Sequence, residues 1–152
     1  LLDHHDGDVS LAQDLLNCMA VNKADFTLSF RRLCDLSTSK DSKKSTLDDS
    51  FITLFEDQSA AEYWLVKWRA RLHLEERSEL DRQINMRALN PTYIPRNHRV
   101  EEVIIAALRE DFGPFEKLVD VLSLPFGDQP KNFDFQNPPQ QNEIVLETFC
   151  GT

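Results

Sequence analysis

The chain has 152 residues, 41% of them apolar and 28% charged, which is enough for the core of one ordinary domain or of a piece of a larger one. Its 17 Lys and Arg against 26 Asp and Glu give a net charge of −9. This acidic balance argues against a nucleic-acid surface, which needs clustered basic residues, and against binding to an anionic membrane. No apolar run approaches the roughly 20 residues that span a bilayer.

The N-terminus and the cysteines give two further expectations about the protein. The sequence starts at Leu1 with neither an initiator Met nor a signal peptide, so we expect it to be part of a longer protein. The three cysteines, Cys18, Cys34 and Cys150, form neither a CxxC pair nor an even-numbered disulfide framework. Such usage favours a reducing compartment, either the cytoplasm or an organelle matrix.

Residues 1–36 predict a helical hairpin. Their apolar residues recur at three- and four-residue spacing, which is the helical period, and Asp8 and Asp25 stand where two helices would be capped. Residues 37–46 contain only Ser, Thr, Lys and Asp. We expect an exposed loop there, and it is the best candidate for a disordered or inserted segment.

Residues 47–124 predict a helical core. A long helix opens at Ser59 and carries Trp64 and Trp68 on a broad apolar stripe, which implies burial because each indole can remove on the order of 200 Å² from water. The basic residues of this helix lie off the stripe: Lys67, Arg69 and Arg71. A further helix is expected over residues 79–89, where apolar residues align at four-residue spacing.

A second helix pair and a tail complete the chain. Asn97 can cap the next helix, and the last helix begins with Pro114, a residue favoured in the first helical turn. Residues 125–152 lose the helical stripe, so we expect an extended, Pro-rich tail with a short strand over residues 144–146. The predicted class is all-α.

The triplet Asp111-Phe112-Gly113 has the letters of the magnesium-binding motif of protein kinases, and His98-Arg99 lies upstream. A kinase catalytic loop needs a base Asp after His-Arg, where this chain has Val100, and an Asn where it has Ile105. The four glycines are too far apart to form a phosphate-binding loop. The triplet is therefore predicted to be a helix end and a turn.

Residues 3–8, Asp-His-His-Asp-Gly-Asp, offer nitrogen and oxygen ligands and raise the question of a metal site. As a calcium loop with Gly7 in sixth place, the segment would have Leu2 and Gln13 where carboxylates are needed. We predict an exposed N-terminal segment with a capping role, and no metal site.

The connector from Asn90 to Arg99 holds Pro91 and Pro95, which interrupt the helical pattern because each lacks an amide donor. One interpretation is a rigid link between helices. The other is that Arg96 and His98 face a charged partner or an acidic surface. The residues alone leave both open.

Three blocks in this order carry a family resemblance. The first is an Asn-Pro-x-Tyr-x-x-Arg-Asn pattern, which the chain meets at Asn90, Pro91, Tyr93, Arg96 and Asn97. A Pro-Phe-x-x-Gln-Pro turn follows at residues 125–130, and Cys150 stands third from the end. Together with weaker matches upstream, these blocks make the chain resemble the C-terminal region of the SelO (YdiU) family, most strongly over residues 90–152.

The resemblance implies an all-α C-terminal subdomain of a kinase-like protein adenylyltransferase, which transfers AMP from ATP to Ser, Thr or Tyr hydroxyls. ATP and Mg²⁺ would bind in the preceding kinase-like part, and no catalytic, cofactor or metal residue carries over to this chain. The implied partners are that N-terminal part and protein substrates. The implied location is bacterial cytoplasm, or mitochondria for a eukaryotic protein.

Within this family a Cys or selenocysteine occupies the place of Cys150, which implies a redox role. Because Phe149 precedes it, the partner thiol would be Cys18, Cys34 or a cysteine elsewhere in the parent protein. Cys18 and Cys34 themselves lie on or beside apolar helical faces and are expected to act as small buried hydrophobes. The alternatives to the adenylyltransferase are an autonomous acidic helical interaction module and a thiol-redox protein using Cys150.

Overall fold

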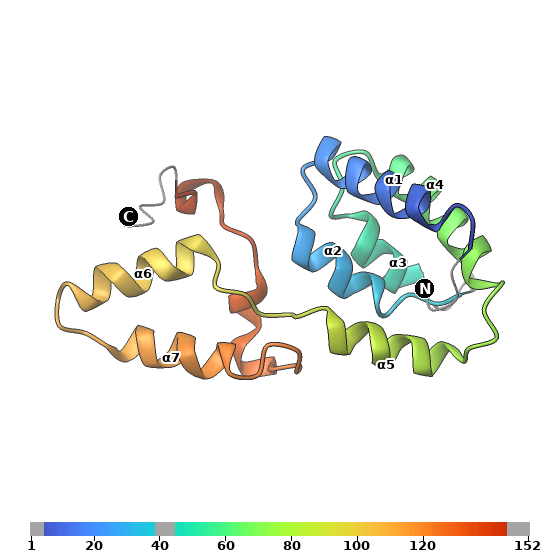
Figure 1. Ribbon diagram of the computed structural model, residues 1–152. Helices are drawn as coiled ribbons and strands as arrows, with labels where there is room; N and C mark the ends of the chain where they lie inside the picture. The colour runs from blue at the N-terminus through green and yellow to red at the C-terminus, as the bar shows by residue number, and fades with distance from the viewer. Residues whose placement is uncertain (1–4, 39–44, 146–152) are drawn as a thin grey trace. The chain divides into compact units, whose positions relative to one another are not determined.

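A computed structural model describes residues 5–38 and 45–145, and all regular structure in these two ranges is helical (Figure 1). The predicted all-α class is confirmed. The chain divides into two compact units, residues 1–90 and 91–152. No helix in the described ranges combines the length and the apolar character needed to cross a membrane.

The helices of each unit follow in chain order. The first unit holds α1 (Asp8–Val21), α2 (Phe26–Leu33), α3 (Ser45–Ile52), α4 (Gln58–Leu72) and α5 (Glu79–Leu89). The second unit holds α6 (Asn97–Ala107), α7 (Gly113–Leu122) and two 3₁₀ helices, η1 (Pro130–Gln136) and η2 (Gln141–Glu143). The division falls inside the 47–124 stretch expected as one helical core, at the point where Pro91 ends the helical pattern.

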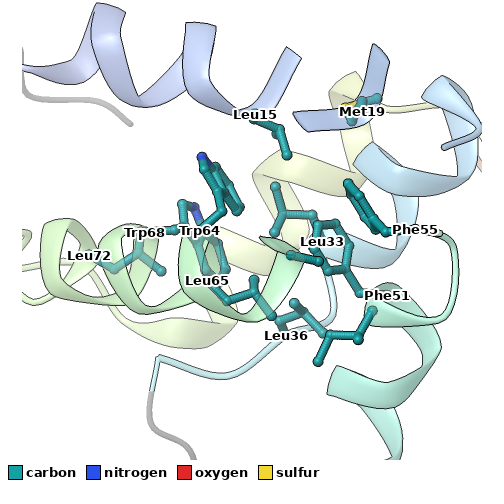
Figure 2. Packing of buried hydrophobic residues seen from close by; sticks show 12 residues of the cluster. Leu15, Met19, Leu33, Leu36, Phe51, Phe55, Trp64, Leu65, Trp68 and Leu72 are labelled. Atoms are coloured by element: carbon teal, nitrogen blue, oxygen red, sulfur yellow. The ribbon is translucent and has the colours of Figure 1, made fainter. Parts of the chain in front are cut away.

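The core of the first unit lies where α1 packs on α4 and where α3 packs on both α2 and α4 (Figure 2). Phe51 is completely buried, and Trp64 stacks on Trp68 with ring centroids 6.1 Å apart. The indole nitrogen of Trp64 donates a hydrogen bond to the carbonyl of Leu11 in α1, at 2.9 Å. The predicted burial of the tryptophan stripe is confirmed, and the indole hydrogen bond fixes α1 on α4.

Two arginines that the stripe left on the outside are also buried. Arg69 donates to both carboxylate oxygens of Asp48 in α3, at 2.6 and 2.9 Å, and its Nε donates to the carbonyl of Ser37 at 3.0 Å. Arg71 donates to both oxygens of Asp8 at the start of α1, at 2.6 and 3.1 Å. The guanidinium groups therefore join the same helices that pack in the core, and Arg69 also ties the segment at Ser37 to α4.

Helix starts fall within two residues of their predicted places. Asp25 caps α2 as predicted, its Oδ1 accepting from the amide of Leu28 at 2.8 Å. Asp8 is not a cap: Gly7 takes that position in the left-handed conformation, with φ of 101°, and the Asp8 carboxylate pairs with Arg71 instead. The helix predicted to open at Ser59 begins one residue earlier, at Gln58, and is capped by Asp57.

The polar loop predicted for residues 37–46 is described only at its edges. Ser37 is buried rather than exposed, because its hydroxyl donates to Glu79 of α5 at 2.8 Å and its carbonyl accepts from Arg69. Residues 39–44 lie outside the described ranges, so order or disorder there stays a prediction. α3 begins at Ser45, and Ile52 ends it.

In the second unit, α6 and α7 form the predicted antiparallel pair (Figure 1). Arg96 rather than Asn97 takes the N-cap position of α6, while Pro114 stands in the first turn of α7 as predicted. The tail is less extended than expected, since η1 and η2 shape it as far as Glu143. Ile144 and Val145 are not in a strand, and residue 146 lies outside the described ranges.

Burial of the Arg69–Asp48 pair predicts a large loss of stability when one partner is removed. Asp48→Asn leaves the Arg69 charge without its counter-ion in a site where the two side chains are only 10% and 11% exposed. We expect the free energy of unfolding to fall by about 3 kcal/mol, measured by urea denaturation followed by tryptophan fluorescence. Glu56→Gln, which breaks the exposed Lys23–Glu56 pair, should cost about 0.5 kcal/mol or less.

Asp8 predicts a pH dependence of the first unit. The hydrogen bond from Arg71 lowers the pKa of the Asp8 carboxyl from its usual 3.8 to about 2. A carboxyl with a depressed folded-state pKa stabilises the fold above its unfolded-state value and loses that stabilisation as the pH falls. The stability difference between the parent protein and Asp8→Asn should therefore shrink between pH 3.8 and about pH 2. A difference that stays constant over this range would contradict the pairing.

Candidate functional site

Two of the sequence blocks meet in the second unit through Tyr93. The hydroxyl of Tyr93 donates to the carbonyl of Gln129 at 3.1 Å and accepts from the amide of Gln129 at 3.2 Å. The amides of Thr92 and Tyr93 donate to the carbonyl of Pro125 at 2.8 and 3.2 Å. Tyr93 is buried, so the connector and the turn at residues 125–130 form one closed polar joint.

The side chain of Gln129 closes the end of α7. Its amide nitrogen donates to the carbonyls of Val121 and Leu124, at 2.8 and 3.0 Å, and its oxygen accepts from Asn132 at 2.7 Å. The last carbonyls of a helix have no partner within that helix, and here a downstream side chain donates to one of them, that of Val121, and to the carbonyl of Leu124 just beyond the helix. Tyr93 and Gln129 thus serve packing and capping in the described contacts.

Asn90 performs a similar task at the end of α5 in the first unit. It is the C-cap residue, and its side-chain nitrogen donates to the carbonyl of Met86 at 2.7 Å. The same nitrogen lies 3.7 Å from the sulfur of Cys34, and the Asn90 carbonyl accepts from buried Arg31 at 3.2 Å. Pro91 follows directly and is half-buried.

The remaining residues of the first block, Arg96 and Asn97, stand at the start of α6 beside a hollow of about 350 Å³. The hollow is lined by residues 94–98, by Pro139 and by residues 143–145. Arg96 and His98 are buried, whereas the Asn97 side chain is exposed. His98 also lines a second hollow of about 300 Å³, on the side of α6 that carries Glu102 and Ile105.

His98 is the unusual residue of this hollow. Its side chain is only 4% exposed, and neither Nδ1 nor Nε2 has a hydrogen-bond partner among the described residues. Burial lowers the pKa of the His98 imidazole, and the neighbouring charge of Arg99 lowers it further. The ring is therefore neutral near neutral pH, with one nitrogen able to donate and the other able to accept.

The Asp111-Phe112-Gly113 triplet lies in the turn between α6 and α7, as predicted. Asp111 Oδ1 accepts from the amide of Gly113 at 3.0 Å, which is a local turn contact. Asp111 and Phe112 are both exposed. The three residues that spell the kinase motif therefore form the connection between two helices.

The remaining candidates from the sequence are the metal ligands and the cysteines. No group of three His, Cys, Asp or Glu side chains suited to a metal ion occurs in the described ranges, so no residue there is assigned to Mg²⁺. Cys34 is fully buried, and burial raises the pKa of its thiol to about 11. Cys18 is half-buried with a raised pKa, also through burial. Cys150 lies outside the described residues.

Comparison with known proteins shows that the chain is similar to proteins named as nucleotidyltransferases. The chain is 46% identical over 153 residues to the "Protein nucleotidyltransferase YdiU" of Bradyrhizobium sp. (strain ORS 278), covering 100% of this chain and 30% of that protein. It is 50% identical over 147 residues to the protein of that name from Rhodopseudomonas palustris (strain HaA2), covering 95% of this chain and 29% of that protein. A relative from Rhizobium meliloti (strain 1021) is 46% identical over 153 residues, with coverage of 100% and 30%.

A match to a family model shows the family to which the chain belongs. A family model described as "Protein adenylyltransferase SelO" matches residues 2–123, well over half of the chain. The chain belongs to this family, which confirms the resemblance drawn from the sequence blocks. The model covers the helical part where the blocks were weaker, and it ends before the turn at residues 125–130. The chain spans about 30% of the length of the relatives it matches.

The Tyr93 joint predicts a local loss of protection. Tyr93→Phe removes the acceptor of the Gln129 amide and the donor to the Gln129 carbonyl, at an expected cost of about 1–2 kcal/mol. Hydrogen exchange should show the amide of Gln129 exchanging about tenfold faster or more. Tyr63→Phe, at an exposed tyrosine of the first unit, should leave these rates unchanged. Equal rates in the Tyr93 variant would exclude the joint.

Proposed function

We propose that the full-length protein is a protein adenylyltransferase that transfers AMP from ATP to Ser, Thr or Tyr hydroxyls of proteins. The observation that carries the proposal is the family match over residues 2–123, supported by relatives named as protein nucleotidyltransferases. In this reaction the hydroxyl oxygen bonds to the α-phosphorus, the bond to the bridging oxygen breaks, pyrophosphate leaves and the hydroxyl proton passes to a base. Mg²⁺ would neutralise the phosphate charge.

The part of the protein described here would support this chemistry without performing it. The polar groups of the family block at Tyr93 and Gln129 are engaged with each other, and Asn90 is engaged with α5. The ATP and Mg²⁺ sites are therefore proposed for the preceding part of the full-length protein. The proposed location is the cytoplasm for a bacterial protein.

The α6–α7 pair supplies a surface for contact with that preceding part. Large apolar side chains stay exposed around its turn, where Leu108 is 82%, Phe112 is 56% and Phe115 is 50% exposed. Exposed apolar residues gathered in one place are typical of surfaces that another segment covers. Since the relatives are more than three times as long as this chain, we propose that their kinase-like part is the segment that covers it.

A redox role for Cys150 remains a proposal that rests on its place in the family. Of the two cysteines in the described residues, Cys34 is a poor partner, because a thiol with a pKa of about 11 is almost wholly protonated at neutral pH. Measuring the pKa of Cys150 and its pairing under oxidant tests the role. An unreactive Cys150 thiol would end it.

The adenylyl transfer is tested on the full-length protein incubated with ATP and Mg²⁺. Intact-protein mass spectrometry should show the added mass of AMP on the protein itself or on a protein of a bacterial lysate. The α,β-methylene analogue of ATP should give no adduct, because its bridging carbon blocks release of pyrophosphate. Absence of any adduct with ATP, or a phosphate adduct in place of AMP, would contradict the proposal.

The docking surface makes a separate prediction. In the full-length protein, Phe115→Ser should lower the free energy of unfolding by about 2 kcal/mol or more if another segment covers this side chain. Lys117→Ser, two residues away on the exposed side of α7, is the matched control and should stay within about 0.5 kcal/mol. Equal, small effects of both substitutions would mean that Phe115 remains in water. The adenylyl-transfer proposal would be unaffected by that result.

A further inference from the structure

The imidazole of His98, in the first turn of α6, is enclosed without a hydrogen bond. The residue is only 4% exposed, both ring nitrogens are shielded from water, and neither has a partner among the described residues. A neutral ring tolerates such a site at a cost of about 1–3 kcal/mol. A charged imidazolium is far more costly to bury without a counter-ion, so His98 takes up a proton readily only where its surroundings open.

The C-terminal tail forms part of those surroundings. His98 and residues 143–145 together line two hollows, of about 350 and 300 Å³, and the charge of the Glu143 carboxylate acts on the imidazole. Glu143 ends η2, a single 3₁₀ turn in which its amide donates to the carbonyl of Gln140 at 2.9 Å. One such turn is not stable by itself, so it depends on the segment staying beside α6.

The tail has a second attachment to α6 that does not involve the imidazole. Arg99 donates to the carbonyl of Asp134 at 3.3 Å, and its guanidinium lies 5.4 Å from the ring centroid of Phe135. Both partners belong to η1, and Pro138 and Pro139 lie between η1 and η2. Opening at His98 can therefore be confined to residues 139–145, while Arg99 keeps η1 on α6.

Charged groups around the imidazole decide how it responds to pH. Four belong to α6 and its cap and one to the tail: Arg96, Arg99, Glu101, Glu102 and Glu143. Burial lowers the pKa of His98 below its usual 6.5, the arginine charges lower it further, and the charges of Glu143 and Glu102 oppose this shift only in part. The closed form therefore has its full stability above pH 6.5 and loses it as the pH falls below that value, because the opened form binds the proton more readily.

We propose that His98 is a proton-sensitive latch between α6 and the tail. With the imidazole neutral, residues 139–145 lie closed beside α6, and uptake of one proton by the ring releases them. The proton comes from solvent and stays on the imidazole, so release is reversed when the pH is raised. The latch is built from residues of the second unit alone and does not rest on adenylyl transfer.

Hydrogen exchange of the full-length protein, followed from milliseconds to hours by mass spectrometry, tests the latch. The measured quantity is the protection of the peptide that contains the Glu143 amide, relative to an unstructured peptide at the same pH because the intrinsic rate also changes with pH. Protection should stay constant above about pH 7 and fall several-fold on acidification, to a limit of about tenfold at about pH 5.5 for release coupled to one proton. Peptides from α4 should show no such fall. Constant protection of the tail peptide over this range would overturn the proposal.

Variants separate His98 from the other titrating groups. His98→Phe keeps a ring but removes the titrating group, so its tail peptide should stay protected at about pH 7.5 and should not lose protection as the pH falls below 6.5. His98→Leu should behave in the same way, which keeps the test valid if the Phe ring does not fit. Titration of the carboxylates occurs in all of these proteins and cancels in the comparison. His73→Phe, at an exposed histidine of the first unit, should retain the profile of the parent protein. An equal fall in the parent protein and in both His98 variants would refute the latch.

Discussion

The first unit depends on one buried guanidinium more than on any single apolar contact. Arg69 reaches from α4 to the carboxylate of Asp48 in α3 and to the carbonyl of Ser37, which follows α2. A charge held away from water at this depth is stabilised only by a counter-ion and acceptors in good geometry. The Arg69–Asp48 pair joins α4 to α3, the helix that places Phe51 in the core.

The same principle recurs at other buried arginines, which act on backbone carbonyls. Arg82 donates to the carbonyl of Leu36 and lies over the ring of Trp68, 5.1 Å from its centroid. Arg31 donates to the carbonyl of Asn90 at the end of α5. Guanidinium groups suit this work because they carry five donors in a fixed plane and can satisfy several carbonyls at once. A modest apolar core is thus completed by polar contacts between distant segments.

Helical period was sufficient to predict the class, the tryptophan stripe, the Asp25 cap and the turn at Asp111-Phe112-Gly113, because each depends on neighbours within a few residues. Two caps were misplaced by one residue, at Asp8 and Asn97, where Gly7 and Arg96 take the position, since local sequence does not decide between neighbouring residues. Burial of Arg69 and Ser37 was missed because charged and hydroxyl residues are normally exposed, and their partners lie far away in sequence.

The candidate site shows the same limit. The Asn90-to-Asn97 block could be recognised as a pattern, and its prolines indicated a rigid connector. Its pairing with Gln129 could not be derived, because a Tyr hydroxyl bonded across 36 residues leaves no periodic signal. Burial of His98 was equally hidden, since its cavity also needs residues of the tail, and an unpaired imidazole is visible only when its surroundings are known.

Burial of Cys34 has a consequence for how oxidants would act on this molecule. The thiol lies at zero exposure, donates to the carbonyl of Phe30 and is contacted by Asn90. An oxidant meets it only when the surrounding residues open, so the reaction rate would follow the frequency of that opening. Oxidation at Cys34 would then trap the opened form, and the oxidised fraction would measure how often this part of the first unit opens under stress.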